Sequence, residues 1–221
     1  MNFSWDVAAA AFPKLMAGAV VTLQATVLGF VLALLIGLGL TALRRSRLAF
    51  IGATAFWVME VLRSTPLLVK AYFLFFGLPA WGITLEPLTT GVIALGLHHG
   101  AFASETMRAG IESIPRSQWE AAASLNFPRG ALYRRVILPQ ALRPVLPAFG
   151  NMMISMMKDT PVLFSISVTE MMFVANEIGA LEFRYTEATT LAALIFLAFS
   201  LIGGTLVRML ERRLQRKGYA T

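Results

Sequence analysis

Long apolar stretches separated by short polar segments dominate the chain. No charged residue occurs between Leu15 and Leu43, and a helix of that length would measure roughly 43 Å, enough to cross a bilayer with tilt. Four further charge-poor stretches follow, at about 49–79, 87–110, 147–168 and 188–207. We therefore predict an all-α polytopic membrane protein with five transmembrane helices, which together form a single transmembrane domain over residues 1–221.

The second stretch differs from the others because charged residues interrupt it. Pro66 lacks a backbone N–H and is expected to kink the helix, so we interpret this stretch as an oblique helix that leads into a span. Unpaired charge inside a bilayer is costly and tends either to pair or to line a pathway. The candidate pathway or gating residues are the ionisable side chains in or next to the apolar stretches: Glu60, Arg63, Lys70, His98, His99, Glu105, Lys158 and Asp159. Structural pairing is the alternative, and Glu60 and Arg63 have the spacing for it.

Composition agrees with a chain that is solvated by lipid. Hydrophobic residues make up 57% and charged residues 14% of the sequence, whereas soluble domains usually carry about 25% charged residues. The sequence contains no cysteine, which excludes disulfides and cysteine-ligated metals. His98 and His99 are adjacent and no metal-ligand pattern surrounds them. We predict no metal or cofactor, and we expect the two histidines to make buried polar contacts in the bundle, with substrate contact as the alternative.

The formal net charge of +7 indicates the orientation of the chain in the membrane. Most of the 19 basic residues lie in three segments, 44–47, 108–143 and 208–217, whereas the start of the chain and the segments 79–86 and 170–187 hold few. Basic residues concentrate on the cytoplasmic side of a membrane. We therefore expect an N-terminus outside and a cytoplasmic C-terminus. The acidic residues of the outer loop are expected to be solvated or to form a docking surface: Glu170, Glu177, Glu182 and Glu187.

The cytoplasmic segment 113–140, between spans three and four, predicts two short helices. Ser117 and Glu120 have the spacing of a capping box, which would start a helix over residues 118–125. Asn126 is suited to the left-handed position that ends such a helix. Pro128 suits the first turn of a second helix, and Pro139 is expected to follow its end. We name residues 113–140 the coupling segment.

This segment resembles the cytoplasmic signature of the permease subunits of ABC importers. The signature contains E-A-A, then a glycine after three residues, and later I-x-L-P. Its counterparts here are Glu120, Ala121, Ala122, Asn126 in place of the glycine, and Ile137 with Leu138 and Pro139. Residues 63–68 (RSTPLL), 105–111 (ETMRAGI) and 158–160 (KDT) are similar to motifs of the polar amino acid branch of that family. The resemblance extends over nearly the whole chain.

The resemblance implies a function in ATP-driven import and a set of partners. It implies a bacterial inner-membrane protein whose coupling segment docks on a cytoplasmic ABC ATPase dimer. It further implies an extracytoplasmic substrate-binding protein and a second permease, which is a sister chain in a heterodimer or, alternatively, a second copy. The sequence contains no phosphate-binding G-x-x-x-x-G-K-[ST] loop, so we expect the chain not to be an enzyme and ATP hydrolysis to occur on the separate subunit.

The substrate and the competing functions are less closely defined. Residues 96–99 (GLHH), Asn126 and residues 183–187 (FRYTE) look most like permeases for ectoine and hydroxyectoine, with general polar amino acids as the alternative. A stand-alone secondary transporter or channel is a second hypothesis, for which inverted repeats and unwound helices would be expected. A membrane-anchored DNA-binding protein is a third, suggested by arginines in a helix-turn-helix. We expect no nucleic-acid binding, because membrane topology accounts for those arginines.

Overall fold

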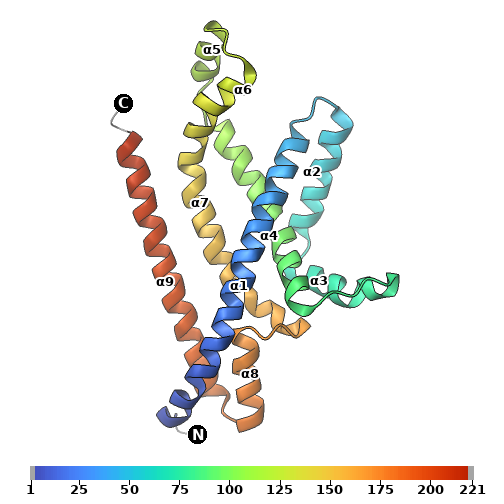
Figure 1. Ribbon diagram of the computed structural model, residues 1–221, viewed down its shortest axis with the longest axis vertical. Coiled ribbons are helices and arrows are strands. Elements are labelled where there is room, and N and C mark those ends of the chain that lie inside the picture. The colour runs from blue at the N-terminus through green and yellow to red at the C-terminus, as the bar shows by residue number, and fades with distance from the viewer. Residues whose placement is uncertain (1–2, 219–221) are drawn as a thin grey trace.

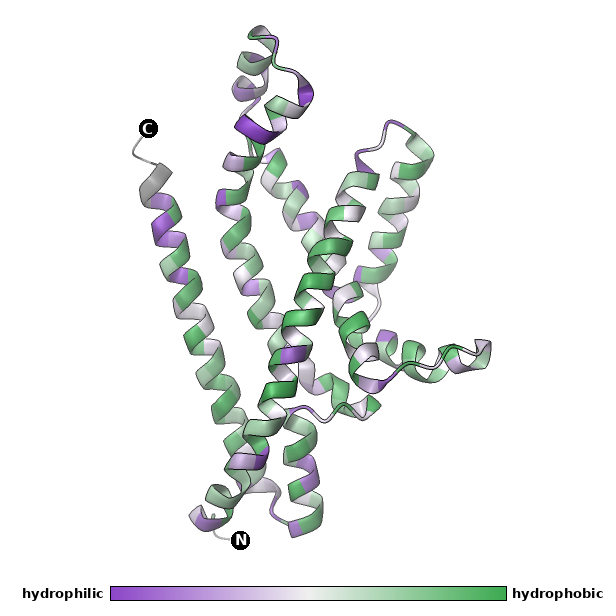
Figure 2. Cartoon of the chain, viewed as in Figure 1, coloured by the Kyte–Doolittle hydropathy of each residue, from purple (hydrophilic) through white to green (hydrophobic). Residues whose placement is uncertain are grey.

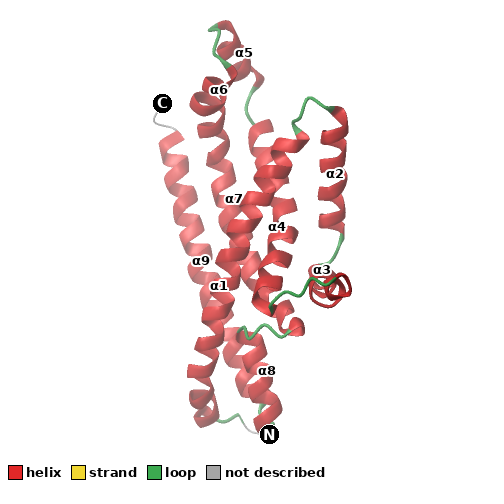
Figure 3. Ribbon diagram, turned by 45° about the vertical axis from the view of Figure 1, so that its right-hand side comes forward, coloured by secondary structure: helices red, strands yellow, loops and turns green. Residues whose placement is uncertain are grey.

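The computed structural model describes residues 3–218, and within that range the chain is helical, with no β-strand (Figures 1 and 3). Two helices run most of the length of the molecule, α1 (Trp5–Arg44) and α9 (Tyr185–Gly218). Helix α4 (Pro87–Glu112) packs closely along α1. Hydrophobic residues cover the middle of α1 and α9, while hydrophilic residues gather at the end of the molecule that carries α5, α6 and the C-terminal part of α9 (Figure 2).

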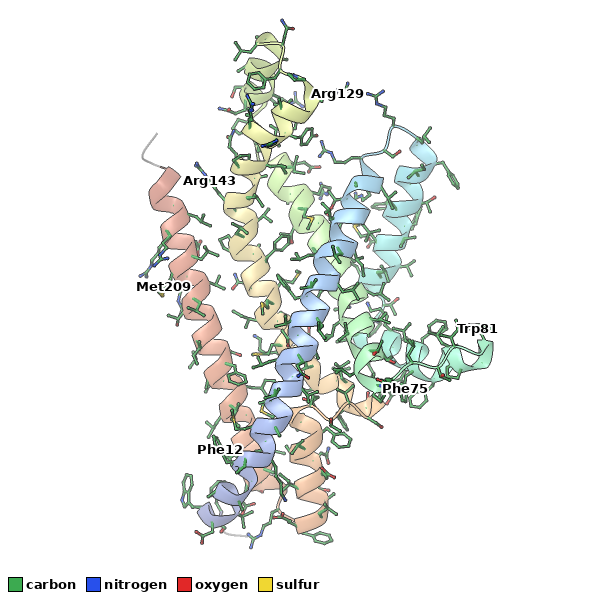
Figure 4. All side chains as sticks on the ribbon, in the orientation of Figure 1. Phe12, Phe75, Trp81, Arg129, Arg143 and Met209 are labelled. Carbon is green, nitrogen blue, oxygen red and sulfur yellow. The ribbon has the colours of Figure 1, made fainter. Side chains whose placement is uncertain are left out.

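The second predicted span is a sharply broken helix. Helix α2 (Ala49–Ser64) ends before Thr65 and Pro66, and the chain then continues through α3 (Leu67–Tyr72), a π-helical segment η1 (Phe73–Gly77) and a 3₁₀ segment η2 (Leu78–Trp81). The two parts are bent by 103° at the break. The second part therefore projects sideways from the bundle, and Trp81 lies near the tip of the projection (Figure 4).

The fourth predicted span ends in a second break. Helix α7 (Leu138–Asp159) continues into a 3₁₀ segment η4 (Thr160–Ile166), after which α8 (Met171–Glu182) takes a direction 48° away. Segment η4 contacts α3, so the two breaks lie next to each other in the fold. They are also alike in sequence, since Thr65-Pro66 and Thr160-Pro161 each follow the end of a long helix.

Among the described residues, two helices are long and apolar enough to cross a membrane alone, Trp5–Arg44 and Tyr185–Gln215. Each bent pair could add one span, which gives up to four. Helix α4 is outside this set because its polar residues, including His98 and His99, lower its mean hydropathy. Polarity and small residues suit α4 to an interior position, where its contact face includes Gly96 and Gly100.

Buried side chains form a core along the length of α1. At the N-terminal end, Leu15 packs with Met171 of α8 and Ile195 of α9. Near the breaks, Leu95 of α4 packs with Met156 and with residues of α3 and η4. A separate cluster around Ile114 and Ile137 holds the coupling segment against the ends of α4 and α7. The sites described below lie at these last two clusters.

Candidate functional site

A buried lysine occupies the first helix break. The side chain of Lys70 is 7% exposed, and its Nζ donates to the carbonyl oxygens of Leu62 (2.6 Å) and Thr65 (3.0 Å) and to Nδ1 of His98 (2.8 Å). The ammonium thus satisfies carbonyl groups that α2 leaves open at its end, where the helix dipole also favours positive charge. Accepting this bond requires a neutral His98 with its proton on Nε2.

A histidine–aspartate pair lies beside the lysine at the second break. His99 is 5% exposed, and its Nε2 lies 3.0 Å from Oδ2 of Asp159, at the C-terminal end of α7. The rings of His98 and His99 are 5.1 Å apart and nearly perpendicular. The four residues Lys70, His98, His99 and Asp159, which we name the polar cluster, therefore connect the two breaks through α4.

The other candidate pathway residues lie outside this cluster. Arg63 does not pair with Glu60 within the described part of the chain; its guanidinium lies 5.8 Å from the ring centroid of Phe102. Lys158 is exposed, and Glu60 is partly buried and makes no hydrogen bond or ion pair with the described residues. Glu105 is nearer the α1–α2 turn, where it bonds Arg44 of α1 and accepts from Arg108 Nη2 at 2.7 Å.

The coupling segment begins differently from its sequence-based prediction. Helix α5 (Arg116–Ser124) starts after Pro115, and no side chain caps it. The predicted capping box is therefore wrong: Ser117 lies inside the first turn, because Pro115 already fixes an extended backbone that starts the helix two residues earlier. The hydroxyl of Ser124 donates to the carbonyl oxygen of Glu120 at 3.0 Å.

The predicted end of this helix at Asn126 is confirmed. Asn126 has a φ of 52°, in the left-handed region. The N–H of Phe127 donates to the oxygen of Ala122 at 3.0 Å and that of Asn126 to the oxygen of Ala123 at 2.9 Å. These two bonds constitute a Schellman motif, which glycine usually ends and which asparagine tolerates better than most residues. The replacement of the signature glycine by asparagine is therefore compatible with the turn.

The second predicted helix does not end before Pro139. Helix α6 (Arg129–Leu132) passes through a π-helical segment η3 (Tyr133–Ile137) directly into α7. Proline interrupts a regular helix because it has no N–H and crowds the preceding turn. Here the wider π turn of η3 ends at Ile137, and only Leu138 separates it from Pro139. The same arrangement occurs at Pro79, which follows η1 by one residue.

Helix α5 has an inner face and an outer face. Ala122 is buried and Trp119 packs into the cluster of Ile114 and Ile137, so both face the rest of the chain. Glu120 and Ala121 are exposed, and Leu125 beside them is 72% exposed. The sequence analysis did not single out Leu125; an exposed leucine at a helix end has no signal in the hydropathy pattern. Figure 1 shows that α5 and α6 project beyond the end of the bundle, where a partner can reach this outer face.

Two acidic residues of the expected outer loop are buried rather than solvated. The carboxylate of Glu170, 0% exposed, accepts from the backbone N–H groups of Met172 (2.9 Å) and Phe173 (2.7 Å) and thereby caps α8. Glu187, 3% exposed, accepts from the N–H of Ser4 and from Arg184. The prediction that these two residues are solvated is wrong, because both satisfy backbone donors at helix ends.

Comparison with known proteins agrees with this architecture. The family model of the binding-protein-dependent transport system inner membrane component matches residues 38–216. A probable amino-acid ABC transporter permease of Sinorhizobium fredii is 36% identical over 98% of this chain and 97% of its own length. The glutamine transport system permease GlnP of Escherichia coli is 35% identical over 97% of this chain and 99% of its own length.

A solved structure has the same fold. An amino acid ABC transporter crystallised with histidines contains a chain with a TM-score of 0.92 and 32% identity, covering 96% of this chain and 100% of that one. The similarity extends over both helix breaks and the coupling segment because nearly the whole length is matched. The chain therefore belongs to the family of binding-protein-dependent transport system inner membrane components, and it is the permease subunit of an amino-acid ABC importer.

Proposed function

We propose that this permease forms the membrane pathway for a small zwitterionic solute and that the polar cluster is part of it. The observation that carries the proposal is the position of the cluster where two broken helices meet. No carboxylate forms an ion pair with Lys70 within the described residues. Its three N–H donors are already bonded, so Lys70 contributes positive charge to the wall of the pathway rather than a direct bond to the solute. Asp159, whose side chain is 38% exposed, offers a negative charge for the cationic end.

We further propose that α5 is the contact with the ATPase. The family implies a cytoplasmic ATPase and a substrate-binding protein as partners. Glu120, Ala121 and Leu125 form an exposed face at the projecting end of the molecule. Asn126, Ile137 and Pro139 support this face from behind, through the Schellman turn and the passage into α7. The small side chain of Ala121 lets a partner approach the helix backbone.

The proposed topology has five spans with the N-terminus outside. Helix α4 is the fifth span, carried in the interior by its contacts with α1. The three basic segments support the orientation, since the α1–α2 turn, α5–α6 and the end of α9 lie at one end of the molecule (Figure 1). The chain has no native cysteine, so Arg47→Cys and Leu181→Cys each provide a single thiol. A membrane-impermeant maleimide should label only Leu181→Cys in intact cells; labelling of Arg47→Cys instead would reverse the orientation.

The permease core is proposed to be a heterodimer with a sister permease. The side projection exposes an aromatic surface that a second permease could cover: Phe73 is 53%, Phe76 61% and Trp81 67% exposed. Homodimerisation is the alternative. Co-expression of two differently tagged copies of this chain distinguishes them, because co-purification of both tags in the active complex would show a homodimer.

The substrate is proposed to be ectoine or hydroxyectoine, with polar amino acids as the alternative. Relatives of this chain are described as permeases for glutamine and for L-cystine, so a polar zwitterion fits the group as a whole. Residues 96–99, Asn126 and residues 183–187 support ectoine. Uptake of radiolabelled ectoine, glutamine and cystine by the same proteoliposomes decides between them.

Reconstitution with the ATPase and the binding protein tests the function itself. The variant Glu120→Lys should assemble normally and lose ATP-driven uptake. Arg212→Glu, a charge reversal on the exposed end of α9, is the matched control and should retain uptake. Unchanged uptake by Glu120→Lys would overturn the role of α5. Uptake by the permease without the ATPase and the binding protein would instead establish a stand-alone transporter. That hypothesis expects unwound helices, and the breaks between α2 and α3 and between α7 and α8 agree with it.

A further inference from the structure

Two consecutive arginines in the α1–α2 turn join different parts of the molecule. Arg44 forms an ion pair with Glu105 of α4, and its guanidinium lies 5.3 Å from the ring centroid of Phe56 on α2. Arg45, the C-cap of α1, donates from Nη2 to the hydroxyl of Tyr133 at 2.7 Å. Arg44 therefore fastens the turn to the bundle, and Arg45 fastens it to the coupling segment.

Tyr133 connects this contact to the helix that faces the ATPase. Its ring packs edge-on against Trp119 of α5, with 5.8 Å between the ring centroids, and the guanidinium of Arg45 lies 5.8 Å from the centroid of the same ring. Trp119 immediately precedes Glu120. Tyr133 is also the first residue of the π-helical segment η3, and such segments occur often at functional sites.

Among the described residues, the Arg45–Tyr133 contact is the only hydrogen bond that joins the α1–α2 turn to residues 113–140. From Arg44 the connection continues to Glu105 of α4, which lies six residues, or about 9 Å of helix, from His99. A path of side-chain contacts, joined by the backbone between Arg44 and Arg45 and by the helix between Glu105 and His99, thus leads from the inner face of α5 to the polar cluster.

We propose that Arg45 is a positioning residue that transmits the movement of α5 to the α1–α2 turn and, through Arg44 and Glu105, to the polar cluster. The proposal rests on the proposed function, because it assumes that an ATPase moves α5. The proposal gives Arg45 a role beyond orienting the chain in the membrane, for which its positive charge alone is sufficient. Arg47 lies in the same turn and carries the same charge, yet it makes no hydrogen bond or ion pair with any residue between 3 and 218.

The exposure of the Arg45–Tyr133 contact makes the proposal testable. The contact is solvent-exposed, so it contributes little to the stability of the fold, and its removal should leave a folded, assembled permease. The contact would instead determine when the α1–α2 turn follows the movement of α5, and in which direction. A double-mutant cycle measures the energetic coupling between Arg45 and Tyr133 directly.

The experiment measures uptake per ATP hydrolysed by the complete importer in proteoliposomes. Arg45→Ala and Tyr133→Phe should each lower this ratio, at least about fivefold for Arg45→Ala, while the thermal stability of the complex stays unchanged. The double variant should be no worse than Arg45→Ala alone, because both substitutions break one contact. Arg47→Ala, the matched control, should behave as wild type. A wild-type ratio in Arg45→Ala, or additive losses in the double variant, would overturn the proposal.

A covalent bridge provides a second, independent readout. Arg45→Cys combined with Tyr133→Cys gives the only thiol pair in the chain, which a flexible bismaleimide can join. Cross-linking should restore the ratio in the double variant and not in either single variant; failure to restore it would overturn the proposal. The failure of the proposed function looks different: wild-type proteoliposomes would then take up solute without ATP, and Arg45→Ala would leave that uptake unchanged.

Discussion

Gly37 and Gly39 lie two residues apart on α1 and form a matched pair for measuring helix packing. A Cβ atom at Gly37 would lie 2.7 Å from Cβ of Ala103, 3.0 Å from N of Ser104 and 3.1 Å from O of Gly100. A Cβ atom at Gly39 would have no described atom within 4 Å apart from the adjacent backbone of α1 itself. Two of the three contacts at Gly37 are with backbone atoms of α4, so no side-chain rotation relieves them. The substitution Gly37→Ala must therefore push α1 and α4 apart.

The expected difference in stability between Gly37→Ala and Gly39→Ala comes from the close contacts that only Gly37→Ala creates. Both alanine substitutions gain helix propensity, up to about 1 kcal/mol, and this gain cancels in the comparison. Overpacking at Gly37 costs about 1–3 kcal/mol. Separation of the helices also weakens the contact between the hydroxyl groups of Thr41 and Ser104, 3.1 Å apart, which adds on the order of 1 kcal/mol. Gly37→Ala should thus be less stable than Gly39→Ala by about 2–4 kcal/mol.

Thermal unfolding of the purified permease in detergent measures this difference. A gap of that size corresponds to roughly 4–16 °C in Tm for a chain of this length, and far-ultraviolet circular dichroism follows the loss of helix. Gly39→Ala should unfold at or slightly above the temperature of the wild type. Equal Tm values for the two variants would refute the close packing of α1 on α4, because helix propensity alone does not distinguish the positions.

Three further substitutions test the sites described above. Lys70→Met should lower the Tm and reduce uptake, because it leaves two carbonyl oxygens without a donor, at about 1–3 kcal/mol each; a Tm equal to wild type would contradict the bonding described here. His99→Ala and Asp159→Asn should each reduce uptake and show a coupling of about 0.5–3 kcal/mol in a double-mutant cycle, whereas additive effects would mean that the pair acts separately. Asn126→Gly should keep or raise the Tm, while Asn126→Val should lower stability by about 1–2 kcal/mol at the left-handed position; the reverse order would exclude the Schellman turn.

The hydropathy pattern predicts the long helices well and their ends poorly, and it misses α8, which lies in the segment expected to be an outer loop. The break at Pro66 and the turn at Asn126 were expected because proline and asparagine act through the local backbone. The capping box at Ser117 failed because Pro115, just upstream, starts the helix first. The predicted helix end before Pro139 is wrong, because a widened turn accommodates a proline that a regular helix does not.

The contacts of the candidate site could not be predicted from spacing. Lys70 and His98 are 28 residues apart and His99 and Asp159 are 60 apart, so their meeting depends on how the two broken helices pack against α4. The sequence indicated that these side chains needed partners but not which ones. Glu105 illustrates the limit. It is ionisable and lies on α4, as His98 and His99 do, yet it bonds Arg44 of α1 and no residue of the polar cluster.

The polar composition of α4 has a consequence for membrane insertion. A segment that contains two adjacent histidines, two glutamates and an arginine partitions weakly into lipid when it leaves the translocon alone. Helix α1 precedes it in the chain, is strongly apolar, and presents Ala33, Ile36 and Gly37 to receive it. Insertion of α4 therefore depends on pairing with a helix that is already in the bilayer. Substitutions that widen the α1–α4 interface should accordingly reduce the amount of permease in the membrane during synthesis, before any effect on transport is measured.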